Sequence, residues 1–232
     1  MPLRCTFNPI AGRESRFPHG STGKAEVKKN VAIIGAGPAG LEAAYIAGQR
    51  GHSVTVYEAS DRLCGGQLRM ASSSPCKDIL QHVPEFFKVQ LERMDNVEIK
   101  LNTPVTESNV GDLNADYVLL ATGATPLVLP IPGIEKAKIA QDVLLHKAEV
   151  SGNVVICGGG QVGVETALEL LERGHKVSIV EMLPDLILKE ELMTRIVMMK
   201  KLADAEVPVY CRHKVSRFTD GAVEIEDMQT LS

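Results

Sequence analysis

The sequence predicts an α/β protein of two lobes, each built around a parallel sheet. The main observation is an internal repeat, in which residues 30–58 (NVAIIGAGPAGLEAAYIAGQRGHSVTVYE) recur at 153–181 (NVVICGGGQVGVETALELLERGHKVSIVE) without a gap. Each copy reads as strand, glycine turn, helix and strand, which is the pattern of a βαβ unit. The chain has 232 residues, 44% of them hydrophobic, so two such lobes can each bury a core.

Composition and charge exclude several classes of protein. The net charge of −4 argues against a general nucleic-acid binder, which carries a basic excess. No run approaches the ~20 apolar residues that a membrane helix needs, and the first residues show no secretory signal. The five scattered cysteines form neither a dense disulfide framework nor a C-x-x-C pair. We therefore expect a cytoplasmic protein without a membrane or nucleic-acid partner.

Within each copy, a short apolar run suits a strand that is buried on both faces of a parallel sheet. A helical pattern follows the glycine turn and stops at Gly51 or Gly174, a residue type that suits the position after a helix. An alternating segment then predicts the second strand. The predicted strands are 31–34, 52–58, 154–157 and 175–181, and the predicted helices are 38–50 and 162–173.

Outside the repeat, the pattern is weaker but regular. Helices are predicted at 78–94 and 189–204, the second amphipathic, and strands at 97–101, 116–121, 207–211 and 222–226. The proline-rich segment 129–135 indicates a linker. The predicted organisation is an extended arm over 1–29, a first lobe over 30–150 and a second lobe over 151–232.

The glycine turns carry the chemistry. Each follows the pattern G-x-G-x-x-G between a strand and a helix, where backbone N–H groups at the helix N-terminus bind a pyrophosphate. The turn residues are Gly35, Gly37, Pro38, Ala39 and Gly40 in the first copy, and Gly158, Gly160, Gln161, Val162 and Gly163 in the second. This context predicts two Rossmann-like lobes, although a structural glycine turn is the alternative for either copy taken alone.

An acid ends the second strand of each copy. Glu58 and Glu181 stand where a carboxylate accepts hydrogen bonds from the ribose hydroxyls of an adenosine. Glu181 also repels a 2′-phosphate, and no Arg follows it directly, so the second lobe favours NADH over NADPH.

The sequence resembles the two-dinucleotide-binding flavoprotein superfamily. The GAGPAG turn with Glu58 matches the FAD pattern, and the GGGQVG turn matches the NAD pattern. The resemblance further implies FAD contacts by Gly66, Gln67, Leu68, Val105, Ala121, Thr122 and Gly123. An ordinary turn is the alternative for the segment around Gly66. Glu165 is expected either near the nicotinamide or as a solvated acid on its helix.

The segment CTFNPIAGRE resembles more closely the 2,4-dienoyl-CoA reductase and trimethylamine dehydrogenase family, whose members are old yellow enzyme-like NADH:flavin oxidoreductases. In that family an FMN-bearing barrel and an iron-sulfur cluster precede the FAD (or ADP) and NAD(P) portions. Cys5 matches the fourth cysteine ligand of the cluster, in the pattern Cys-x-x-Asn-Pro. The barrel and the other three cluster cysteines are absent here, so Cys5 is expected to be a cluster ligand only in a full-length protein and a free thiol in this chain alone. A segment that completes the FAD lobe is also missing, so both lobes are expected to lack their C-terminal closing strands.

The resemblance implies a module that passes a hydride from NADH to FAD. In intact relatives, electrons continue through the iron-sulfur cluster to FMN and reduce an enoate or enoyl-type substrate. The expected partners are the dinucleotides and a missing FMN-barrel domain or subunit. We nominate no catalytic side chain, because the cofactors carry the chemistry. Two alternatives stay open: a structural domain that binds ADP without redox turnover, and a relative of the pyridine-nucleotide disulfide oxidoreductases.

Overall fold

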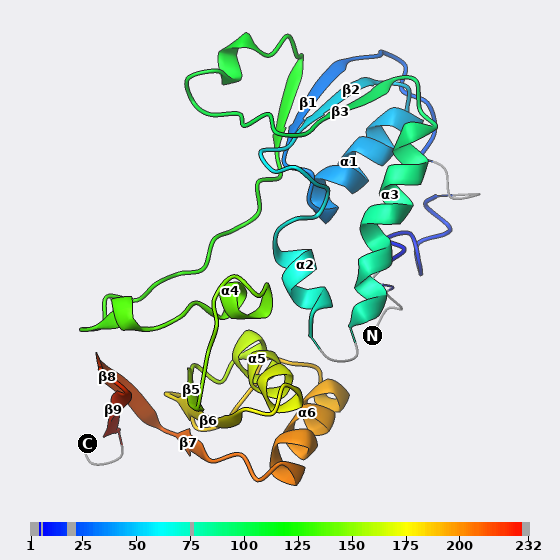
Figure 1. Cartoon of the computed structure of the whole chain (residues 1–232). Coiled ribbons are helices and arrows are strands. Elements are labelled where there is room, and N and C mark those ends of the chain that lie inside the picture. Colours follow the sequence, from blue (N-terminus) through cyan, green and yellow to red (C-terminus); the bar gives the residue numbers. More distant parts are fainter. Residues whose placement is uncertain (1–4, 6, 18–21, 75–76, 229–232) are drawn as a thin grey trace. The chain divides into compact units, whose positions relative to one another are not determined.

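The computed structural model describes residues 5, 7–17, 22–74 and 77–228 (Figure 1). The described residues form two compact units. The first comprises Met1–Arg69 and Ile79–Ala124, and the second comprises Met70–Asp78 and Thr125–Ser232. Residues 125–150 therefore cluster with the second unit, although the sequence analysis grouped them with the first lobe. The reason is α4 (Ala140–Leu144), whose Val143 is buried in the second core.

The first unit is a parallel sheet with helices. Its strands are β1 (Asn30–Ile34), β2 (Ser53–Tyr57), β3 (Val97–Lys100) and β4 (Tyr117–Leu120), in the order β3-β2-β1-β4. All three pairings are parallel. Helices α1 (Pro38–Gln49) and α3 (His82–Glu92) pack against each other and on one face of the sheet (Figure 1). This strand order is part of the doubly wound arrangement that binds nucleotides at the carboxyl ends of its strands.

The core of the first unit lies between the sheet and these helices. Ile33 and Val56 from the strands, and Leu41 and Leu91 from the helices, are almost fully buried. In contrast, all four residues of β4, the strand at one edge of the sheet, are exposed.

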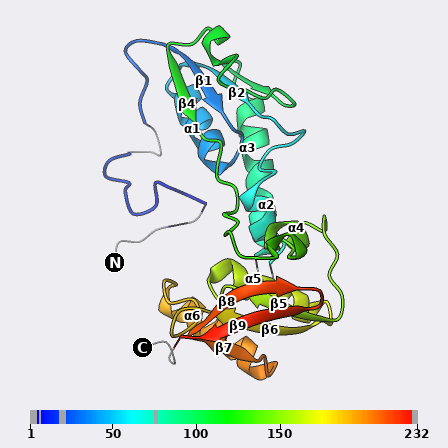
Figure 2. The ribbon, with the colours of Figure 1, turned by 90° about the vertical axis from the view of Figure 1, so that its left-hand side faces the viewer.

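The second unit repeats this plan with β5 (Asn153–Cys157), α5 (Gln161–Glu172), β6 (Lys176–Glu181), α6 (Leu192–Asp204) and β7 (Val209–Cys211). These strands are parallel in the order β5-β6-β7. Strands β8 (His213–Thr219) and β9 (Ala222–Asp227) form an antiparallel hairpin that contacts β6 on the side away from α5 (Figure 2). The hairpin also holds the proline-rich segment, because the Phe218 N–H donates to the Pro132 carbonyl at 2.8 Å.

Both repeat helices end in the same way. Gly51 and Gly174 adopt positive φ angles of 92° and 84°. The N–H of each donates to a carbonyl three residues earlier, and the following histidine N–H donates to a carbonyl five residues earlier. This is a Schellman motif, which explains the glycines and gives His52 and His175 a structural place.

Most predicted elements are confirmed, with small shifts at their ends. Helices α2 (Gln67–Ser72) and α4 and strand β8 were not predicted, because they are short or lack a clear period. The predicted helix 189–204 begins only at Leu192, because the Glu191 carboxylate caps it by accepting from the N–H groups of Met193 and Thr194. In the predicted arm, the described residues 8–17 form consecutive turns rather than an extended chain. None of the helices in the described part of the chain is long and apolar enough to cross a bilayer.

Candidate functional site

The glycine turn of the first unit connects β1 to α1. Gly35 has a φ of +107°, and a Cβ added there would collide with the Ala121 carbonyl at the end of β4. A Cβ at Gly40 would collide with the Gly35 carbonyl, so this glycine allows the helix to approach the strand. Gly37, in contrast, has open space where a Cβ would be. The turn therefore presents an uncovered backbone surface at the N-terminus of α1.

The second unit has an equivalent turn between β5 and α5. Gly158 has a φ of +110°, a Cβ at Gly163 would collide with the Gly158 carbonyl, and Gly160 faces open space. Neither α1 nor α5 has a side-chain N-cap hydrogen bond or an acidic residue in its first turn. The N–H groups and the positive end of each helix dipole thus remain available to an anion. Both turns can hold a pyrophosphate, because they offer backbone N–H donors and have open space beside the second glycine.

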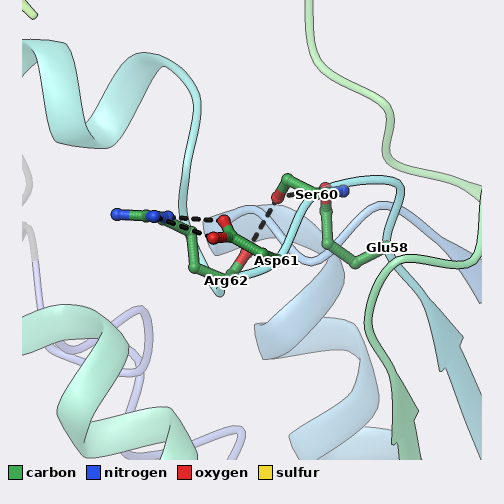
Figure 3. Close-up of polar contacts among 4 residues, drawn as sticks. All are labelled: Glu58, Ser60, Asp61 and Arg62. Carbon is green, nitrogen blue, oxygen red and sulfur yellow. Dashed lines mark hydrogen bonds and ion pairs between the residues drawn. The ribbon is translucent and has the colours of Figure 1, made fainter.

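The acid of the first unit clamps its own turn. Glu58 accepts the Ala36 N–H on Oε2 at 2.8 Å. Its Oε1 accepts the Ser60 N–H and hydroxyl, each at 2.8 Å (Figure 3). Burial raises the pKa of Glu58, but these hydrogen bonds outweigh it and leave the pKa below its ordinary value. Glu58 is therefore ionised at neutral pH, and a carboxylate with three such donors still has acceptor capacity for a ribose hydroxyl.

The charged residues that follow Glu58, Asp61 and Arg62, pair with each other. Asp61 and Arg62 form a bidentate ion pair with hydrogen bonds of 2.7 and 2.9 Å (Figure 3). The Ser60 hydroxyl also contacts the Arg62 carbonyl at 3.0 Å, which orders the chain after β2.

Glu181 holds the second turn in the same manner. Its Oε2 accepts the Gly159 N–H at 2.5 Å, and its Oε1 accepts the Leu183 N–H at 2.7 Å. The donors Gly159 and Leu183 stand at the repeat positions of Ala36 and Ser60. The two copies therefore share one local arrangement, in which a strand-end carboxylate ties down a glycine turn.

The other segments assigned to FAD gather near the first turn. The Cys64 N–H donates to the Ala36 carbonyl at 2.9 Å, and the Gln67 side chain donates to the Ala124 carbonyl at 3.2 Å. These contacts bring the segment around Gly66 and the segment 121–123 to the carboxyl ends of β1 and β4. Burial, and then the charge of Glu58, raise the pKa of the Cys64 thiol to about 11, so it stays protonated at neutral pH.

The remaining predicted positions of the first unit surround this region. Gly66 has open space beside its Cα, Thr122 and Gly123 are exposed, and Leu68 packs against the first core. Val105 follows β3 and is half-buried. Cys5 is exposed, and no contact in the described part of the chain brings it to the other predicted residues. No three potential metal-ligating side chains come together among the described residues.

A pocket of about 330 Å³ lies beside the second turn. It is lined by Gly159, Gly160, Gln161, Glu181, Leu183, Asp185, Ile187, Leu188, Lys189 and Glu190. Its volume is within the range of small-ligand sites, and its walls combine the anion-binding turn with the clamping acid. The loop 183–190 was not among the predicted site residues, because no motif marks it.

Glu165 is buried in α5, with 6% of its surface exposed. Its Oε1 forms an ion pair with Lys77 and accepts a hydrogen bond from Gln161 at 2.9 Å. The alternative of a solvated helix-face acid is therefore wrong for Glu165, because Lys77 and the helix packing cover it. Lys77 is a further residue that sequence reasoning missed, since it lies 88 positions away and follows no recognisable motif.

Two parallel sheets, each with a glycine turn tied to a strand-end acid, define an α/β protein of the Rossmann-like, dinucleotide-binding class. Residues 29–231 match the family described as pyridine nucleotide-disulphide oxidoreductase. The chain therefore belongs to this family, and the predicted superfamily and the predicted α/β class with parallel sheets are confirmed. The expected lack of closing strands stays a prediction.

Individual relatives narrow the resemblance. The chain is 42% identical to an NADH oxidase of Thermoanaerobacter brockii, a match covering 87% of this chain and 31% of the relative. It is 42% identical to a cinnamate reductase of Clostridium sporogenes, over 80% of this chain and 27% of the relative. A solved 2-naphthoyl-CoA reductase complex superimposes with a TM-score of 0.87 at 28% identity, over 97% of this chain and 34% of that one.

The chain thus spans about a third of the length of these relatives. The family and these named oxidases and reductases place the chain among the NAD(P)H-dependent, FAD-containing oxidoreductases.

Proposed function

We propose that this chain is the FAD- and NADH-binding portion of a flavoprotein reductase, and that it passes a hydride from NADH to FAD. The proposal rests on a hydrogen bond that both units share. Glu58 after β2 accepts the Ala36 N–H, and Glu181 at the end of β6 accepts the Gly159 N–H. Bound NADH supplies a hydride and bound FAD accepts it, which is chemistry that belongs to the cofactors.

The first unit would hold FAD. Gly35, Gly37, Pro38, Ala39 and Gly40 present the turn to the pyrophosphate, and Glu58 accepts from a ribose. Gly66, Gln67, Leu68, Val105, Ala121, Thr122 and Gly123 would contact the rest of the flavin nucleotide. The hydrogen bond from Gln67 to the Ala124 carbonyl supports this grouping, because it joins two of these segments.

The second unit would hold NADH. Gly158, Gly160, Gln161, Val162 and Gly163 face the pyrophosphate, and Glu181 accepts from the adenosine ribose. Glu165 would lie toward the nicotinamide end, where its ion pair with Lys77 neutralises its charge. A neutral pair is favourable there, since a single buried carboxylate would be costly.

The activity of a whole protein is a second part of the proposal. The relatives are about three times as long, and two of those compared above are named for the reduction of cinnamate and of a naphthoyl-CoA. We infer that electrons leave the FAD of this chain for an iron-sulfur cluster and an FMN barrel, as a further domain or subunit. Cys5 would then be a cluster ligand. The cytoplasmic location stays a prediction.

The decisive experiment is the absorbance spectrum of the purified protein after incubation with FAD, before and after anaerobic addition of NADH. We expect bound flavin that bleaches with NADH. A protein that takes up no flavin would overturn the proposal, and tight binding of ADP without flavin would support the structural-domain alternative instead.

A matched pair of variants assigns the two cofactors to the two units. Gly37 and Gly160 have ordinary φ angles of −76° and −71° and open space for a methyl group, so alanine should leave the fold intact. We expect Gly37→Ala to weaken FAD binding and Gly160→Ala to weaken NADH binding, each by roughly tenfold or more, because the methyl group intrudes on the phosphates. An unchanged affinity in both variants would contradict the assignment.

A further inference from the structure

The loop between β6 and α6 forms the outer wall of the 330 Å³ pocket. Three carboxylates line this pocket, those of Glu181, Asp185 and Glu190, together with one cation, Lys189. Glu181 already has a role in holding the turn. Asp185, four residues further on, is a pocket residue to which the sequence motifs assign no role.

Asp185 is fixed by contacts on both of its oxygens. Oδ1 accepts the Leu186 N–H at 2.8 Å, and Oδ2 forms an ion pair with the Arg195 guanidinium from α6. The Arg195 Nε–H also donates to the Leu186 carbonyl at 3.1 Å. The guanidinium is therefore engaged by the loop, and its carboxylate partner Asp185 lines the pocket.

The loop is also locked to the glycine turn. The Ile187 N–H donates to the Gly159 carbonyl at 2.9 Å, and Leu186 packs so close that a Cβ at Gly159 would collide with it. Ile187 has a φ of +44°, which is rare for a β-branched residue, and its side chain is buried. These contacts fix the position of Asp185 relative to Glu181, because Glu181 accepts the N–H of the same Gly159.

This geometry bears on the choice of nucleotide. If the turn holds the pyrophosphate and Glu181 holds the adenosine ribose, the loop 183–190 borders the remaining space of the pocket. A 2′-phosphate carries a charge of about −1.5 to −2 at neutral pH and would enter this space. It would meet the Asp185 carboxylate, and the nearby guanidinium would be unavailable because Asp185 already occupies it.

We propose that Asp185 is a second determinant of the preference for NADH over NADPH, and that its ion pair masks Arg195 as a ligand for a 2′-phosphate. This inference rests on the proposed function, since it requires that the pocket bind a nicotinamide dinucleotide. It goes beyond the strand-end acid Glu181, because it predicts that discrimination persists when that acid alone is neutralised.

The test measures the dissociation constants of NADH and NADPH by isothermal titration calorimetry. The protein with FAD bound is compared with five variants: Glu181→Gln, Asp185→Asn, Asp185→Ser, Asp185→Asn combined with Arg195→Met, and Asp204→Asn. Asparagine at 185 keeps the acceptor for the Leu186 N–H, and Asp185→Ser is a second variant that does the same. Asp204→Asn is the matched control. It removes the carboxylate of the Lys200–Asp204 ion pair, which lies on α6, the helix of Arg195, but outside the pocket lining.

We expect Asp185→Asn to lower the ratio of the NADPH to the NADH dissociation constant by roughly tenfold. The substitution removes the negative charge of the pair and leaves the positive charge of Arg195 without a counter-charge. The Arg195→Met change should reverse this gain, and Asp204→Asn should leave the ratio unchanged. An unchanged ratio in both Asp185 variants would overturn the inference while leaving the proposed function intact. A gain that survives Arg195→Met would overturn the role of Arg195. A wild-type protein that binds neither nucleotide would overturn the proposed function itself.

Discussion

The two copies of the repeat have the same local hydrogen bonds but different surroundings. In both, the strand-end acid accepts a turn N–H, the third glycine faces the carbonyl of the first, and a Schellman motif ends the helix. In the first copy, however, β4 pairs with β1 and covers Gly35, whereas β5 pairs with β6 alone among the described strands. Ala32 is 2% exposed, while Val155 at the same repeat position is 38% exposed. The similar sequences thus form the same turn, whereas the burial of the strand before it differs with the presence of β4 beside β1.

A second difference concerns a pair of equivalent acids. Glu42 and Glu165 occupy the same place in their helices. Burial raises the pKa of Glu42, and burial is its sole cause. Glu165 is more deeply buried but has Lys77 and Gln161 as partners. The same residue in the same local structure is therefore a small liability in one unit and part of an ion pair in the other.

The largest effect that would test this comparison is expected at the first glycine. We expect Gly35→Ala to destabilise the first unit by about 3 kcal/mol or more, because the methyl group collides with the Ala121 carbonyl and the positive φ is strained. Gly158→Ala should cost only about 1–2 kcal/mol in the second unit, since the strain is the sole cause. Hydrogen exchange of the slowest amides in β1 and β5 measures both losses separately. Equal losses would mean that β4 does not account for the difference.

The next prediction is that neutralising the two equivalent acids changes the stability of their units in opposite directions. We expect Glu165→Gln to destabilise the second unit by about 2 kcal/mol, because it leaves the Lys77 ammonium without its carboxylate. Glu42→Gln should instead stabilise the first unit at pH 7, by no more than about 0.5 kcal/mol. The raised pKa of Glu42 means that its contribution to stability is present at low pH and is lost as the pH rises through that pKa. Hydrogen exchange at pH 7 reads both effects, and Glu172→Gln on the exposed face of α5 is the control. Two losses of similar size would refute the contrast.

The smallest effect concerns the third donor to Glu58. Because the pKa of Glu58 is lowered, its stabilisation is present above the ordinary glutamate pKa and is lost as the pH falls through the lowered value. Ser60→Ala removes the hydroxyl donor and leaves two N–H donors, which is the arrangement found at Glu181. We expect the pKa of Glu58 to rise toward its ordinary value, with a stability loss of about 0.5 kcal/mol at pH 7. The carboxyl-carbon chemical shift of Glu58, followed by NMR during an acid titration, measures this change; a pKa that stays in place would exclude the hydroxyl as a contributor.

The fold class, the two glycine turns and the family could all be predicted from the amino-acid sequence. These features depend on short-range patterns: a strand, a turn and a helix follow one another directly, and each acid lies 22 positions from the N–H that it accepts. The residues around the turns could therefore be named without the structure. Their proposed contacts with FAD and NADH remain predictions, which the Gly37 and Gly160 variants test.

The ion pairs and the burial of the equivalent residues could be found only in the tertiary structure. Lys77 reaches Glu165 across 88 positions, and Asp185 reaches Arg195 from the far end of a loop without a motif. The loop that lines the pocket beside Glu181 is held by the hydrogen bond from the Ile187 N–H to the Gly159 carbonyl, and the Cys64 N–H makes the equivalent bond to the Ala36 carbonyl in the first unit. The two ion pairs leave no periodic signal, because they depend on how elements pack rather than on spacing along the chain. The repeat likewise predicted two similar turns, and the pairing of β4 with β1 is one contact that distinguishes their environments.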